Sequence, residues 1–123
     1  MAEALPPEVA TTLSALLTGS DPVSGALRAQ LPYARVVGRC GCGCATVDLA
    51  VDHTAVPPAP PHGNPAADAW YGEPEDAGAM VFTKGGYLAL LEIYSASSEP
   101  ITTWPEPRFA EHRSTQITGS SPR

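Results

Sequence analysis

The sequence has little lysine, little charge and no long apolar run, and each shortage excludes a class of protein. Lys84 is the one lysine among 123 residues, and residues 40–107 hold nine acids against this single base. Nucleic-acid binding depends on clustered Lys and Arg, so we expect no nucleic acid as a partner. No apolar run approaches the ~18 residues of a membrane span, and no signal-peptide pattern opens the chain. We therefore expect no membrane contact and a cytoplasmic location.

Motifs of the common enzyme classes are also missing. The chain has no phosphate-binding glycine loop, no G-x-G-x-x-G, no G-x-S-x-G, no H-E-x-x-H and no EF-hand loop. These absences disfavour nucleotide-dependent and hydrolytic chemistry. One enzymatic alternative stays open, a small cyclase- or isomerase-like site. In it Glu92 or Asp48, each set among apolar strand residues, acts as the base.

The N-terminal part of the sequence has helical periodicity. Apolar residues recur three or four positions apart from Val9 to Leu17, which predicts an amphipathic helix. A second helix is expected to begin at Pro22, with Asp21 as its cap, and to end at Pro32.

From Tyr33 onward the apolar period changes to two, which is typical of strands. Residues 47–51 predict one strand. Residues 80–94, divided by two glycines, predict a β-hairpin whose second strand is central, because both of its faces are apolar. The predicted fold is α+β, with two short N-terminal helices packed on an antiparallel sheet of about three to five strands, arranged as hairpins or a meander.

The length of the chain suits one domain. We assign residues 1–109 to it, including a proline-rich loop at 53–69. Residues 110–123 are polar and are expected to form a flexible tail.

All three cysteines stand in one C-G-C-G-C stretch, at Cys40, Cys42 and Cys44. Two backbone geometries fit residues 38–45, namely a strand bent by a glycine bulge and a hairpin with the cysteines at its tip. Small side chains that only pack, a metal site, and a redox or nucleophilic thiol all remain open. As a metal site, the three thiolates with His53 or His62 would suit zinc, and three sulfurs alone would suit Cu(I).

A second candidate site combines acidic and aromatic residues. Its members are Asp68, Trp70, Tyr71, Glu73, Glu75 and Asp76. Aromatic residues anchor protein interfaces, and acidic rims steer basic partners toward them. We therefore expect a basic protein partner here, with the oligomeric state left open and a homodimer included. The alternative is a solvated loop with Trp70 packed beneath it.

The sequence also resembles a group of small bacterial proteins. The residues that carry the resemblance are R-C-x-C-G-C-x-T-V at 39–47, G-Y-L-x-x-L-E-I-Y at 86–94 and E-P-I…W-P-x-P at 99–107. Some proteins with this ending are similar to immunity proteins of toxin systems. The resemblance spans about residues 30–107, implies an α+β domain of unknown activity with a hint of protein binding, and brings no catalytic residue. We favour a non-enzymatic, immunity-like binding module without a cofactor, and keep metal or redox handling by the three cysteines as an alternative.

Overall fold

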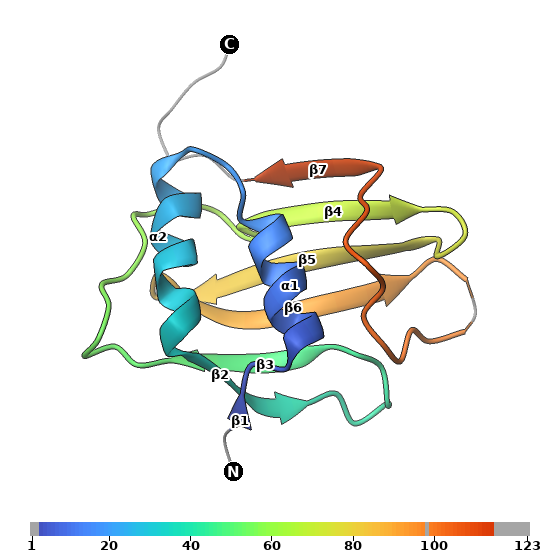
Figure 1. Cartoon of the computed structure of the whole chain (residues 1–123), viewed down its shortest axis with the longest axis horizontal. Coiled ribbons are helices and arrows are strands. Elements are labelled where there is room, and N and C mark those ends of the chain that lie inside the picture. The colour runs from blue at the N-terminus through green and yellow to red at the C-terminus, as the bar shows by residue number, and fades with distance from the viewer. Residues whose placement is uncertain (1–2, 98, 115–123) are drawn as a thin grey trace.

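The computed structural model describes residues 3–97 and 99–114. Its elements in chain order are β1 (Glu3–Ala4), α1 (Pro7–Leu16), α2 (Pro22–Gln30), the 3₁₀ turn η1 (Leu31–Tyr33), β2 (Ala34–Arg39), β3 (Val47–Val51), β4 (Ala67–Gly72), β5 (Ala77–Lys84), β6 (Tyr87–Ser95) and β7 (Glu111–Ser114). The strands form one antiparallel sheet in the order β1-β2-β3-β6-β5-β4-β7. Both helices lie across one face of this sheet (Figure 1). The predicted α+β class and the central position of β6 are confirmed.

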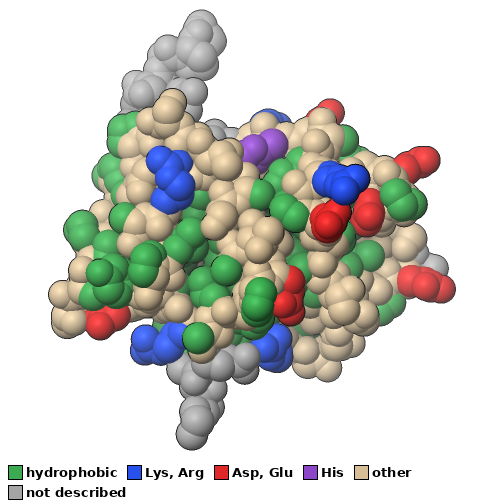
Figure 2. Space-filling view, in the orientation of Figure 1, with side chains coloured by type: hydrophobic (Ala, Val, Ile, Leu, Met, Phe, Trp, Pro, Cys, Tyr) green, Lys and Arg blue, Asp and Glu red, His purple; other side chains and the backbone are tan. Residues whose placement is uncertain are grey.

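On the face that carries the helices, charged side chains are scattered among apolar and uncharged ones, and most acidic side chains lie toward the right of the view, where a basic one lies beside them (Figure 2). Such a surface agrees with a chain in which charged residues make up only 16%. Neither α1 nor α2, the two α-helices of the described residues, has the length and apolar character needed to cross a membrane.

The sheet is larger than the apolar periodicity predicts. It has seven strands, or six without the two-residue β1, against an expectation of three to five. The largest difference is β7, which pairs with β4 inside the segment predicted to be a flexible tail. That prediction is wrong for residues 111–114, because their polar sequence gives no alternation and the strand depends on backbone pairing. The rest of the predicted tail, 115–123, lies outside the described residues.

The two helices follow their sequence signals. The apolar positions from Val9 to Leu17 are at most 1% exposed, and they face the sheet. α2 begins after Asp21, whose carboxylate accepts a hydrogen bond from the Ser24 N–H at 2.9 Å. Arg28 of α2 donates to two carbonyls at the end of α1, where a cation offsets the partial negative charge of the helix terminus.

The predicted β5–β6 hairpin is confirmed, but the residues expected to share one face of β6 do not all lie on that face. Gly85 and Gly86 both have positive φ, as a two-residue type I′ turn requires. Strict alternation predicts Leu88 and Leu90 on the same face. Ala89 forms a bulge, however, because the register moves from Leu90 to Leu88 across a single step of β5. Leu88 is therefore buried in the core, whereas Leu90 stays on the uncovered face.

The buried side chain of Gln30 completes the hydrogen bonds around this bulge. Its Oε1 accepts from the Leu88 N–H at 3.0 Å, and its Nε2 donates to the Gly86 carbonyl at 2.9 Å and to the Pro57 carbonyl at 3.4 Å. The side chain is 0% exposed. One amide thus joins the end of α2, the hairpin turn and the proline-rich loop, in a place where unpaired polar groups are costly.

The proline-rich loop is attached to the sheet by further side chains. The Asn64 amide accepts from the Thr83 N–H at 2.9 Å and donates to the Thr83 carbonyl at 3.0 Å. The Tyr87 hydroxyl donates to the Val56 carbonyl at 3.1 Å. The loop is shorter than predicted, because β4 begins at Ala67.

We predict that Gln30→Met, which keeps a similar volume but removes the amide, lowers the free energy of unfolding by about 1–3 kcal/mol. The reason is that the Leu88 N–H is left buried without an acceptor. Urea unfolding followed by circular dichroism measures this change. Ala29→Met, at an exposed position of the same helix, is the control and should change stability by less than about 0.5 kcal/mol. Equal losses in the two variants would contradict the role given to the amide.

Asp21→Ala tests the helix cap. Burial acts to raise the pKa of Asp21, but hydrogen bonds from Ser24 outweigh it and hold the pKa below its usual value. A lowered carboxyl pKa stabilises the fold above the unfolded-state value, and this stabilisation is lost as the pH falls through the folded-state value. We expect the variant to lose about 1 kcal/mol at pH 7. The difference from the wild type should narrow below about pH 4 in urea unfolding, and a difference independent of pH would contradict capping by the carboxylate.

Candidate metal centre at the β2–β3 tip

The structure decides between the two geometries left open for the cysteine stretch. β2 and β3 pair antiparallel up to Arg39 and Val47, so residues 40–46 form the tip of a hairpin. β2 also contains a bulge near its middle, but the chain reverses at the tip and not there. Gly43 has φ +91°, a conformation that favours glycine, and its N–H donates to the Cys40 carbonyl at 3.3 Å.

The hairpin tip brings the three thiols together. The sulfur atoms of Cys40, Cys42 and Cys44 all lie within 4.8 Å of one another, and those of Cys40 and Cys42 are 2.6 Å apart. An ion about 2.3 Å from each sulfur, as in zinc–thiolate sites, sets the sulfurs roughly 3.8 Å apart. Small side-chain adjustments are enough to reach that spacing. Cys42 is exposed and the other two are half-buried, so a ligand from solvent can reach the group.

Contacts around Ala45 and Thr46 hold the tip in place. The Ala45 N–H donates to the Ile101 carbonyl at 2.8 Å, and its carbonyl accepts from the indole of Trp104 at 3.0 Å. The Thr46 hydroxyl accepts from the Ile93 N–H at 3.0 Å and donates to the Ile93 carbonyl at 3.3 Å. The segment with Trp104 connects β6 to β7 and crosses the sheet beside α1 (Figure 1). These contacts hold the two residues that follow Cys44 against β6 and the segment with Trp104.

Hydrogen bonds shift the pKa values of Cys40 and Cys44 in opposite directions. When the single hydroxyl proton of Thr46 is donated to the Cys44 sulfur instead of the Ile93 carbonyl, it lowers the pKa of Cys44 to about 7, with a further contribution from the Thr46 N–H and against an opposing effect of burial. The hydrogen bond with Cys42 raises the pKa of Cys40, although the Cys42 N–H donates to the Cys40 sulfur and opposes this. Cys44 therefore loses its proton more readily than Cys40.

The structure does not bring His53 to the sulfurs. His53 follows the opposite end of β3, where its ring stacks on Tyr87 at 3.7 Å and 9°. A strand of this length places it more than roughly 13 Å from the cysteine end. Within residues 3–97 and 99–114 the cluster consists of the three cysteines alone. The predicted addition of His53 as a fourth ligand is therefore not formed.

Asp48 and Glu92, the two acids considered as catalytic bases, stand on neighbouring strands. Asp48 pairs with Leu90 of β6, and Glu92 follows two residues later on the same uncovered face. A side chain at Gly38 would overlap the Asp48 carboxylate, so this glycine leaves room for it. The two acids are thus diagonal cross-strand neighbours on an open sheet surface. The enzymatic alternative stays a prediction.

The structure divides the predicted acidic and aromatic group among three places. Three of its acids stand in the turn between β4 and β5, namely Glu73, Glu75 and Asp76. Asp68 and Trp70 lie on the uncovered face of β4, and Asp68 forms an ion pair with Arg113 at 3.0 Å. Successive strand residues point to opposite faces, so Tyr71 points into the core.

Tyr71 is a core residue, and its inclusion in a partner-binding surface is wrong. It is 4% exposed, and its ring packs on Phe109 with the centroids 5.2 Å apart. Its hydroxyl makes no hydrogen bond of good geometry to any described residue. Burial raises the pKa of Tyr71 to about 12, with the Thr12 side chain opposing the rise.

Sequence reasoning missed the residues that position the thiols. Trp104, which stands next to a proline, could be recognised from the sequence as a buried aromatic residue. Its hydrogen-bond partner, Ala45, could not be, because it lies 59 residues away in the sequence. The pairing of Thr46 with Ile93 has no local signature. Comparison with known proteins adds no guide, because no protein-family model, curated protein or solved structure matches the chain.

We predict that Cys44 reacts with iodoacetamide with a midpoint near pH 7, against 9.0 for an ordinary cysteine. Mass spectrometry of the labelled peptides follows each thiol separately. Thr46→Val should move the midpoint upward, because the hydroxyl that stabilises the thiolate is gone. Thr11→Val, at an exposed position of α1, is the control and should leave the profile unchanged. A midpoint that is the same with and without the Thr46 hydroxyl would contradict this explanation.

Proposed function

We propose that the protein binds one Cu(I) ion through the thiolates of Cys40, Cys42 and Cys44. The observation that carries the proposal is the convergence of three sulfurs at a tip that other contacts already hold. Structural zinc sites usually have four protein ligands, and the fourth is missing from the described group. Thiolate is a soft ligand that selects Cu(I), and a site of three sulfurs fits this ion better than zinc.

The surroundings of the thiols support reversible binding of the ion. Thiols must lose their protons to bind a metal, and Cys44 is already substantially ionised at neutral pH. Main-chain N–H groups of Cys42 and Thr46 donate to the sulfurs of Cys40 and Cys44 and so stabilise the negative charge. Because Cys42 is exposed, an incoming thiol can approach the ion from solvent. These features favour capture and transfer of copper over a permanent structural ion.

A redox role is the second candidate, favoured by the contact between the Cys40 and Cys42 sulfurs. Exchange with oxidised glutathione would join these two sulfurs in a disulfide and release two molecules of reduced glutathione. In that case the protein treated with oxidised glutathione loses two hydrogen masses without forming a mixed disulfide at equilibrium. Binding of Cu(I) by the reduced protein distinguishes the two functions.

The test is an anaerobic titration of the reduced protein with Cu(I) in competition with a chromophoric chelator. We expect one equivalent to bind. Serine at any one of the three cysteines should weaken binding by more than the ~10–100-fold that loss of a supporting residue costs, because a direct ligand is removed. His53→Ala is the matched control and should bind like the wild type, since His53 lies away from the sulfurs. No bound copper, or equal weakening by His53→Ala and Cys42→Ser, would contradict the proposal.

A further inference from the structure

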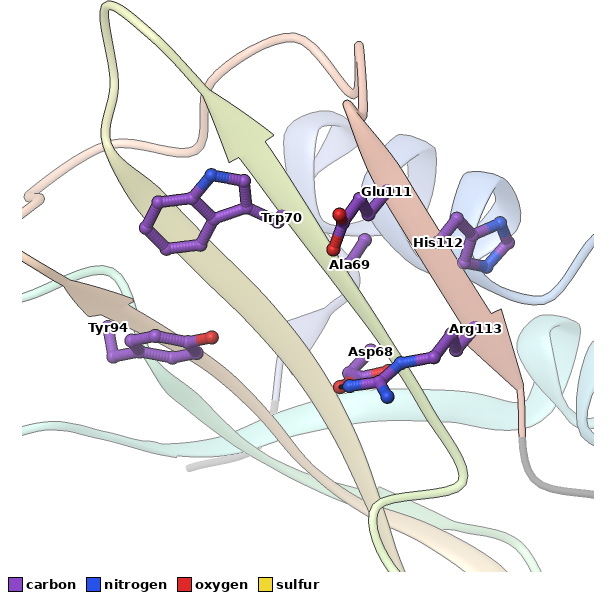
Figure 3. Close-up of a pocket in the computed structure, with 7 residues that line it drawn as sticks. All are labelled: Asp68, Ala69, Trp70, Tyr94, Glu111, His112 and Arg113. Carbon is purple, nitrogen blue, oxygen red and sulfur yellow. Dashed lines mark hydrogen bonds and ion pairs between the residues drawn. The ribbon is translucent and has the colours of Figure 1, made fainter.

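A hollow of about 150 Å³ opens on the face of the sheet that the helices leave uncovered. Figure 3 shows Trp70 and Tyr94 on one side of it and Glu111 with the Asp68–Arg113 pair on the other. Ala69 and His112 also line the hollow, but the His112 ring points to the opposite face, where it contacts the Leu16 carbonyl. The hollow therefore has an aromatic wall and a charged wall.

Gly78 makes the aromatic wall possible. It stands between Trp70 of β4 and Tyr94 of β6 in one cross-strand row. A side chain at Gly78 would overlap the ring of Tyr94, so its absence lets that ring lie across β5. The two rings are then neighbours, with centroids 6.3 Å apart and planes tilted by 36°. Tyr94 is 42% exposed, which leaves part of the ring open to a ligand.

The charged wall favours a cation. Asp68 and Arg113 neutralise each other through their ion pair at 3.0 Å. Glu111 is exposed, and its carboxylate has neither an ion pair nor a hydrogen bond with any other described residue. Aromatic rings also present a negative face. A cation in the hollow would meet attraction from both walls, whereas an anion would be repelled.

We propose that this hollow binds a guanidinium group, stacked on Trp70 and Tyr94 and paired with Glu111. A guanidinium is planar and weakly hydrated, so it stacks on aromatic rings, and its paired N–H donors match a carboxylate. The proposal is independent of the copper site and gives a concrete contact to the basic partner expected from the acidic composition. Its source is either an arginine side chain of a protein or a small free guanidinium compound.

The experiment is an NMR titration of the reduced, copper-free protein, so failure of copper binding does not affect it. The probes are N-acetyl-arginine amide, the tripeptide Gly-Arg-Gly and the tripeptide Gly-Lys-Gly. We expect both arginine probes to shift the indole N–H signal of Trp70 saturably, with little effect from the lysine probe. The indole of Trp104 is buried and bonded to Ala45, so its signal is an internal control and should not move.

Two variants test the two walls. Glu111→Gln should weaken binding about two- to fivefold, the range expected from an exposed charge contact. Glu73→Gln, in the β4–β5 turn, is the matched control and should have no effect. Gly78→Ala displaces the Tyr94 ring and should abolish the shift. If Gly-Arg-Gly binds more tightly than N-acetyl-arginine amide, the site is assigned to an arginine of a protein. If the two arginine probes bind equally, it is assigned to a free compound. No saturable shift of Trp70, or equal effects of Glu111→Gln and Glu73→Gln, would overturn the proposal.

Discussion

Gln30 supplies, from the end of α2, the hydrogen bonds that β6 cannot make for itself at its bulge. The bulge lets Leu88 join Leu91 in the core under the helices, while Tyr94, farther along the same strand, still faces outward. The same amide holds the hairpin turn and the proline-rich loop together. The face of the sheet under the helices is therefore filled by packed side chains, and the opposite face carries exposed aromatic side chains.

Side chains replace main-chain partners elsewhere in the molecule too. Asn64 pairs with both main-chain groups of Thr83, and Thr46 pairs with both main-chain groups of Ile93. The second pair has a chemical consequence, because the same threonine lowers the pKa of the Cys44 thiol. The same contacts anchor one end of a loop with little regular structure in which the three sulfurs lie within 4.8 Å of one another. Preorganisation of this kind is what a binding site requires.

The local features of the fold could be predicted from sequence, and the features that depend on distant contacts could not. The cap at Asp21 and the turn at Gly85–Gly86 can be recognised from adjacent residues in the sequence. The glycines between the cysteines permit the tight tip of the β2–β3 hairpin. The face of Leu88 depends on Gln30, 58 residues away, and no periodicity contains that information. β7 has no apolar pattern, and it joins β4 through the backbone ladder and the Asp68–Arg113 ion pair, neither of which gives a periodic sequence signal. The separation of His53 from the sulfurs follows from the hairpin, which the sequence left open.

In the proposed copper site, three sulfurs and no other group of the protein hold a single soft ion at the hairpin tip. X-ray absorption at the copper edge, on protein loaded with one equivalent of Cu(I), tests it most directly. We expect a first coordination shell of sulfur alone, which disappears when Cys40, Cys42 and Cys44 are all replaced by serine. A nitrogen ligand from a histidine, or copper that remains bound in the triple variant, would contradict it.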